Sequence, residues 1–163
     1  MRPTPHTMSL KLHALLLDRV LLPRWQRWWV YATTGLLVAS GLLWLALDVA
    51  RADQSPSSFQ VWSLRIHGVS AAAAAIAYGS LITAHIRIGW ALDRNRILGA
   101  VNGAIVVALV ASGSALYYAP SEEIRAVASI VHWVIGIAMP VALVVHIYRG
   151  RLVRRRGQAL PRC

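Results

Sequence analysis

The chain is short of cysteine, of acidic residues and of nucleotide-binding motifs. Its single cysteine is the last of 163 residues, which excludes an internal disulfide, a thiolate cage for a metal and a C-x-x-C-H haem attachment motif. Because neither G-x-G-x-x-G nor a P-loop is present, nothing indicates a nucleotide or flavin site. Only 6 Asp and Glu accompany 17 Lys and Arg, so the formal net charge is +11.

The composition favours a membrane protein over a nucleic-acid-binding one. Hydrophobic residues make up 57% of the chain and charged residues only 14%, which is little charge for a soluble domain. The basic residues cluster just beyond the ends of long apolar stretches, as they do in membrane proteins. We therefore expect a lipid bilayer as the partner and no nucleic acid.

Four apolar stretches predict four membrane-spanning helices, because each approaches the roughly 20 residues needed to cross the hydrocarbon. These stretches are 28–47, 61–89, 97–117 and 126–148. Small residues in the first stretch, at Gly35, Ser40 and Gly41, would let another helix approach closely. The expected fold is all-α, an integral membrane four-helix bundle.

The remaining segments flank this bundle. Residues 1–27 form an amino-terminal cytoplasmic or interfacial segment, whose leucine-rich part fits a short helix lying in the membrane interface. Residues 28–150 form the four-helix domain, and 151–163 form a basic tail. Because Lys and Arg concentrate in both terminal segments and in the loop between the second and third spans, both termini should be cytoplasmic.

The second and fourth spans each contain two histidines. His67 and His85 are eighteen residues apart, or five α-helical turns, so their rings should leave one face about 27 Å apart. His132 and His146 are fourteen residues apart, close to four turns, and should share a face about 21 Å apart. Since four crossings make these spans parallel, the expected pairs are His67 with His132 on the outer side and His85 with His146 on the cytoplasmic side.

Three other roles suit these histidines less well. A single histidine in an apolar span could merely hydrogen-bond a neighbouring helix, but two same-face pairs favour ligands. A zinc centre needs nitrogens about 2.0–2.1 Å from one ion, which histidines about 20 Å apart on one helix cannot supply. A proton relay would favour acidic residues, and none lies between 66 and 86 or between 126 and 148. Facing imidazoles on stiff helices instead suit two haems, with the four histidines as iron ligands.

An arginine lies near each histidine and could neutralise a haem propionate. The candidates are Arg65 and Arg125 on the outer side and Arg87 and Arg149 on the inner side. Anchoring at the edge of the membrane is the alternative role for each of them.

The motifs around the histidines are R-I-H-G at 65–68, H-I-R-I-G-W at 85–90, H-W-x-x-G at 132–136 and H-I-Y-R-G-R at 146–151. With these motifs the chain resembles the small four-helix bacterial membrane cytochromes b of the b561 type. It is also similar to the haem-bearing half of cytochrome b in bc-type complexes. The resemblance implies two b haems, each with two histidine ligands, in a multi-pass protein of the bacterial cytoplasmic (inner) membrane.

The expected function is electron transfer across the membrane. Electrons would pass through two stacked haems between the quinone pool and a partner redox protein, with the chain as a membrane subunit of a larger oxidoreductase. Quinone or quinol is thus a second expected ligand, and a stand-alone enzyme is not expected. The alternative is a non-redox membrane anchor or assembly subunit whose histidines only pack; a transporter is less well supported, because the spans lack charged residues and paired broken helices.

Overall fold

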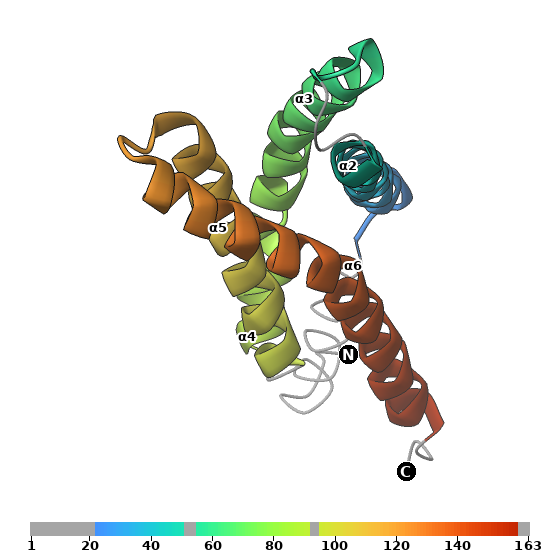
Figure 1. Ribbon diagram of the computed structural model, residues 1–163. Helices are drawn as coiled ribbons and strands as arrows, with labels where there is room; N and C mark the ends of the chain where they lie inside the picture. The colour runs from blue at the N-terminus through green and yellow to red at the C-terminus, as the bar shows by residue number, and fades with distance from the viewer. Residues whose placement is uncertain (1–21, 51–54, 92–94, 160–163) are drawn as a thin grey trace, which may run out of the picture. The chain divides into compact units, whose positions relative to one another are not determined.

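The computed structural model describes residues 22–50, 55–91 and 95–159, and every regular element in these ranges is helical. The chain runs through the elements that Figure 1 labels and through a short π-helix, η1. They are α2 (Arg24–Ala50), α3 (Ser58–Ser80), η1 (Ile82–Ile86), α4 (Arg87–Ala91), α5 (Arg96–Tyr118) and α6 (Glu122–Ala159). The prediction of an all-α protein is confirmed. Most of the predicted interfacial segment, residues 1–21, lies outside the described residues.

Three of the helices are long and apolar enough to cross a membrane. They are α2, α5 and the part of α6 from Glu122 to Val153, which match the predicted spans 28–47, 97–117 and 126–148. The fourth span also continues as an unbroken helix through Pro140. α3 is not among them, since Arg65, His67 and several serines lower its mean hydropathy and the helix ends at Ser80. Four crossings therefore remain a prediction.

The expected continuous α-helix over 61–89 is wrong, because the helix changes type after Ser80. The Ser80 hydroxyl donates to the carbonyl of Ala77 at 2.7 Å, and the amide of Leu81 donates to the carbonyl of Tyr78 at 3.0 Å. The amide of Ile86 then donates to the carbonyl of Leu81 at 3.0 Å, which is the i to i+5 bond of a π-helix. Glycine–serine pairs and serine bonds to the backbone are known causes of such breaks, and Gly79 precedes Ser80.

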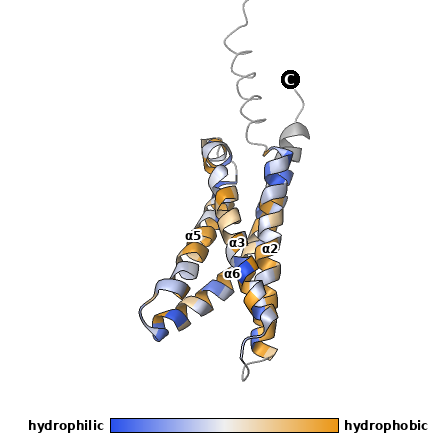
Figure 2. Ribbon diagram, turned by 90° about the horizontal axis from the view of Figure 1, so that it is seen from above, coloured by the Kyte–Doolittle hydropathy of each residue, from blue (hydrophilic) through white to orange (hydrophobic). Residues whose placement is uncertain are grey.

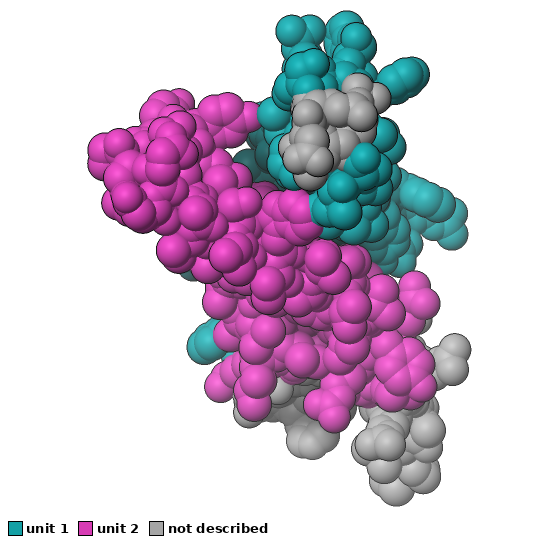
Figure 3. Space-filling view, in the orientation of Figure 1, with its two compact units in different colours: residues 1–92 teal, residues 93–163 magenta. Residues whose placement is uncertain are grey.

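The chain divides into two compact units, residues 1–92 and residues 93–163, which Figure 3 colours separately. In the first unit α2 packs against α3, and in the second α5 packs against α6. Each unit is thus built on a helical hairpin. The second helix carries His67 in the first unit and both His132 and His146 in the second, while His85 lies in η1. Within the first hairpin, Gly41 of α2 lies against the ring of His67 of α3, so the predicted close approach at this glycine is confirmed.

The described residues bury polar side chains and expose large apolar ones. Eight polar side chains are buried: Gln26, Thr33, Thr34, Ser40, Gln60, Ser63, Ser70 and Ser112. Large apolar side chains are instead widely exposed, as Val69 (74%), Ile76 (71%) and Ile97 (80%) illustrate. Figure 2 shows apolar residues along much of each long helix. A surface of this kind is unfavourable in water and suits contact with lipid.

Polar contacts join the two helices of each hairpin. Gln26 of α2 donates to the hydroxyl of Ser80 at 2.7 Å, and the hydroxyls of Thr34 and Tyr78 lie 3.0 Å apart. In the second hairpin the amide of Asn102 donates to the carbonyl of Ala142 at 3.3 Å. Hydrogen bonds of this kind associate helices in lipid, where apolar surface gives no driving force between them.

The contact between Thr34 and Tyr78 gives a direct test of the first hairpin. We expect Thr34→Val and Tyr78→Phe each to lower the free energy of unfolding, and the double variant to cost less than their sum, with a coupling of about 0.6 kcal/mol. Unfolding in mixed micelles measures it. Tyr148→Phe is the control, because Tyr148 is 62% exposed. Strictly additive losses for Thr34 and Tyr78 would contradict this contact.

Candidate functional site

His67 is held through its Nδ1 atom by the neighbouring helix. It lies half-buried on α3, and its Nδ1 is 3.1 Å from the hydroxyl of Ser40 and 3.0 Å from the carbonyl of Leu37, both on α2. A carbonyl only accepts hydrogen bonds, so Nδ1 of His67 carries the proton. The Ser40 hydroxyl donates its own proton to the carbonyl of Leu36 at 2.6 Å and therefore also accepts from His67. In this neutral tautomer, Nε2 has the lone pair that binds a metal.

His132 repeats this arrangement in the second unit. Its Nδ1 lies 3.0 Å from the hydroxyl of Ser112 on α5. That hydroxyl donates to the carbonyl of Ala108 at 2.7 Å, so it accepts the proton on Nδ1. Ser112 is buried and His132 is half-buried. The structure thus favours the Nδ1–H tautomer at both histidines that were predicted to bind the outer haem.

A glycine follows the serine in both hairpins and lies against the imidazole. A Cβ atom on Gly41 would be 3.2 Å from Cε1 of His67, and one on Gly113 would be 3.3 Å from Cε1 of His132. Both distances are closer than side chains usually approach, so any larger residue would push the ring. The ring positions therefore depend on glycine at 41 and 113.

These serine and glycine contacts were not predicted as part of the site, although the sequence contains a signal for them. The five residues L-V-A-S-G occur at 37–41 and again at 109–113. In the sequence, Ser40 and Gly41 indicate only small residues for helix packing, Gly113 is one of three glycines in the span 97–117, and nothing marks Ser112. A search for repeated short segments would have found the pair.

His146 has a different partner. It lies on α6 fourteen residues after His132. Its ring contacts Asn95, the residue just before α5, whereas His132 contacts Ser112 within α5. The Nδ2 atom of Asn95 donates to the backbone carbonyl of His146 at 3.1 Å and lies 3.2 Å from its Nδ1. This amide offers a proton to Nδ1 and does not accept one, so it favours a proton on Nε2. Metal binding through Nε2 requires the Asn95 amide to turn and present its oxygen.

His85 lies half-buried inside the π-helix η1. The prediction that it shares a face with His67 assumed five α-helical turns between them, and the π-segment breaks that register. Short π-segments are frequent at functional sites, where they redirect a side chain. The direction of His85 is therefore set by η1 and not by its spacing from His67.

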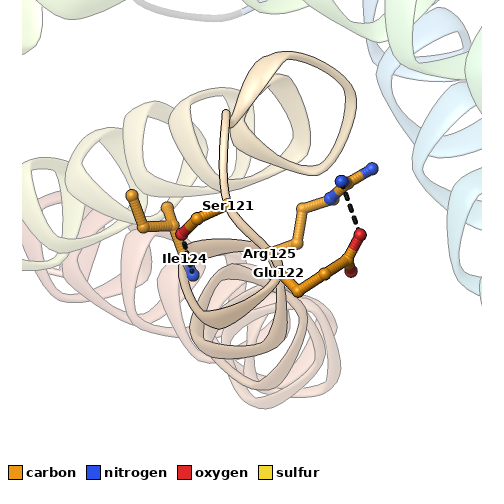
Figure 4. Close-up of polar contacts among 4 residues, drawn as sticks. All are labelled: Ser121, Glu122, Ile124 and Arg125. Atoms are coloured by element: carbon orange, nitrogen blue, oxygen red, sulfur yellow. Dashed lines mark hydrogen bonds and ion pairs between the residues drawn. The ribbon is translucent and has the colours of Figure 1, made fainter.

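The four candidate arginines differ in their contacts. Arg125 forms an ion pair with Glu122 at 2.7 Å near the start of α6 (Figure 4). At the same place the hydroxyl of Ser121 accepts a hydrogen bond from the backbone N–H of Ile124. The Nε of Arg125 is buried without a hydrogen-bond partner among the described residues. Arg65 lies over the ring of Trp62, with 5.1 Å between the guanidinium carbon and the ring centroid. Arg87 and Arg149 are exposed.

The histidines do not form a cluster within either unit. Among the described residues no group of three or more His, Cys, Asp or Glu could hold a metal ion. His67 and His85 belong to the first unit, and His132 and His146 to the second. The pairing of His67 with His132 and of His85 with His146 across the two units therefore stays a prediction.

Comparisons of the chain with protein-family models, with curated proteins and with solved structures find no match. The resemblance to small membrane cytochromes b therefore rests on the histidine motifs. The contacts at Nδ1 of His67 and His132 are the structural features that indicate a site.

Four glycine variants test whether the rings at 67 and 132 are packed as described. Gly→Ala within a helix ordinarily stabilises it by about 0.5–1 kcal/mol. We expect Gly35→Ala and Gly103→Ala to show this gain, because nothing lies within 4 Å of a Cβ at either position. Gly41→Ala and Gly113→Ala should instead lose stability relative to these controls, measured by unfolding in the same micelles. Equal behaviour of all four variants would mean that the rings do not lie against the glycines.

Proposed function

We propose that the chain carries electrons across a membrane through two b haems, each bound by one imidazole from α3 or η1 and one from α6. His67 and His132 would bind the outer haem, and His85 and His146 the inner one. When bound, haem supplies one-electron chemistry that side chains alone do not offer. The chain supplies the ligands, their orientation and the surrounding helices.

The observation that carries this proposal is the bond that His67 and His132 each make through Nδ1 to a neighbouring helix. Histidines that bind metals almost always donate their second N–H to a carbonyl, a carboxylate or water. That bond selects the tautomer, fixes the ring plane and raises the basicity of Nε2. Both outer histidines have this hydrogen bond, so their donor chemistry fits haem iron.

The inner pair is supported by position more than by hydrogen bonding. His146 lies on the same face of α6 as His132, and His85 lies in a π-segment of the kind found at functional sites. The amide of Asn95 can serve as an Nδ1 acceptor after rotation, because it carries both a donor and an acceptor. We infer that only after this rotation would Asn95 accept the Nδ1 proton of His146, as Ser112 accepts the Nδ1 proton of His132.

The arginines have separate roles in this proposal. Arg125 lies two helical turns from His132 on the same face, about 10 Å along the axis, and has a buried Nε to offer a propionate. Arg149 lies one turn from His146 and is exposed, as is Arg87. Arg65 already lies over Trp62, which suits anchoring at the membrane edge as well as a propionate.

The cellular setting follows from the same proposal. The chain would lie in a bacterial cytoplasmic membrane with both termini inside, as the arginine distribution favours. Quinone or quinol on one side and a redox protein or partner subunit on the other would exchange the electrons. The three membrane-capable helices and the exposed apolar side chains support the bilayer as its surroundings.

The alternative function is that of a non-redox anchor, and one feature of the structure supports it. Every hydrogen bond described above for His67, His132 and His146 lies within its own hairpin, so each ring already contributes to helix packing. A packing role requires no partner at Nε2, whereas a haem ligand does. Histidine substitutions separate the two roles.

We expect His67→Ala and His132→Ala each to remove the same haem and leave the other, and His85→Ala and His146→Ala to form the complementary pair. The reason is that a bis-histidine site needs both imidazoles. Haem content and the reduced-minus-oxidised absorption spectrum of each purified variant measure the loss.

His13→Ala is the control for these variants, because residue 13 lies before the first predicted span. It should keep both haems. Single variants that all retain two haems with unchanged spectra would show that the four histidines are not the ligands. Variants that lose haem in the pairs 67 with 85 and 132 with 146 would contradict the pairing across the two units.

A further inference from the structure

The two copies of L-V-A-S-G occupy equivalent places in the two hairpins. Each lies on the first helix of its hairpin, at 37–41 in α2 and at 109–113 in α5, and each contacts a histidine on the second helix. Figure 1 shows α2 and α5 as the two helices that carry them. The loops between segment and histidine differ in length, yet the same residue types meet the ring. The two segments therefore correspond in their contacts with histidine as well as in their amino-acid sequence.

The serine hydroxyl in each copy can only accept a hydrogen bond from the imidazole, because its own proton is already donated elsewhere. Ser40 donates to the carbonyl of Leu36 at 2.6 Å, and Ser112 donates to the carbonyl of Ala108 at 2.7 Å, four residues earlier in both cases. With its proton engaged, each hydroxyl accepts from Nδ1 of its histidine. At His132 the serine therefore sets the tautomer. At His67 the carbonyl of Leu37, 3.0 Å from Nδ1, sets it together with Ser40.

The glycine in each copy leaves space for the imidazole ring beside the helix. A methyl group at Gly41 would lie 3.2 Å from Cε1 of His67, and one at Gly113 would lie 3.3 Å from Cε1 of His132. Cε1 is the ring carbon between the two nitrogens, so a push there displaces Nδ1 from serine and redirects Nε2. Serine and glycine together fix where the ring points.

We propose that segments 37–41 and 109–113 are two copies of one positioning element, each of which presents the histidine of its own hairpin, His67 or His132, through Nε2 to haem iron. Ser40, Gly41, Ser112 and Gly113 are then positioning residues: they act through the histidines and do not touch the iron. The role of haem rests on the function proposed above, whereas the hydrogen-bonded tautomer does not require it.

The element also determines how strongly each imidazole donates to iron. An N–H that donates to oxygen gives the ring more imidazolate character, which makes Nε2 a stronger donor and favours oxidised iron. Loss of the serine hydroxyl should therefore raise the reduction potential of the haem. Ser112→Ala should raise the potential of the haem that His132 binds. Ser40→Ala should raise the potential of the haem that His67 binds by less, because the carbonyl of Leu37 still accepts from Nδ1.

The test uses the full chain with ¹⁵N-labelled histidine, reconstituted in lipid bilayers and kept reduced. Solid-state NMR should show a proton on Nδ1 and none on Nε2 for His67 and His132, assigned by loss of signal in the His→Ala variants. Ser112→Ala should shift the Nδ1 signal of His132. Ser112→Thr, which keeps a hydroxyl, should leave that signal at its wild-type position. Ser114→Ala is the control, since Ser114 is an exposed neighbour on α5. A redox titration of the same variants follows the two haems.

Each outcome decides part of the proposal. A proton on Nε2 of His67 or His132, or Nδ1 signals that neither Ser40→Ala nor Ser112→Ala moves, would overturn the positioning roles. A reduction potential that falls in Ser112→Ala would overturn the proposed effect of the serine on the haem iron. A chain without haem would overturn the proposed function instead, and the Nδ1 signals would still decide the roles of the serines.

Discussion

An imidazole placed among apolar helices must have partners for its nitrogens, and this requirement organises both hairpins. A buried polar group without a partner costs several kcal/mol in an apolar medium, where water is not at hand. His67 and His132 meet the requirement at Nδ1 with a serine on the neighbouring helix. The protein can do so because serine satisfies its own proton on its own helix and still accepts a second hydrogen bond.

The helix contacts follow from that bond. A hydroxyl can reach Nδ1 only if the two helices pass closely, and Gly41 and Gly113 permit the approach beside the ring. The same hairpins are joined elsewhere by Gln26 with Ser80 and by Asn102 with the carbonyl of Ala142. Polar residues therefore lie between the helices and apolar residues outside, as lipid surroundings require. A histidine whose Nδ1–H is held by a neighbouring helix is suited to bind a metal through Nε2, which is why we propose electron transfer over a packing role.

Much of the fold could be predicted from the sequence, because long apolar runs are direct signals for membrane helices. α2, α5 and α6 cover the predicted spans, and α6 continues furthest beyond its span, to Ala159 instead of 148. The end of α3 could not be predicted in this way, since it depends on hydrogen bonds of Ser80 and Leu81 that no hydropathy pattern records. The histidines were identifiable by their spacing, but their partners were not. Ser40 and Ser112 have short polar side chains that pattern analysis assigns to packing, and only the repeated L-V-A-S-G indicates more.

The most direct measurement is the reduced-minus-oxidised absorption spectrum of the purified full-length chain, combined with haem content per polypeptide. If the four histidines are two pairs of axial ligands, the spectrum will show the sharp bands of low-spin b haem, at two haems per chain. A purified, folded chain with no such bands, or with haem far below one per chain after growth with ample haem, would contradict the account. It would leave the histidines with the packing contacts alone.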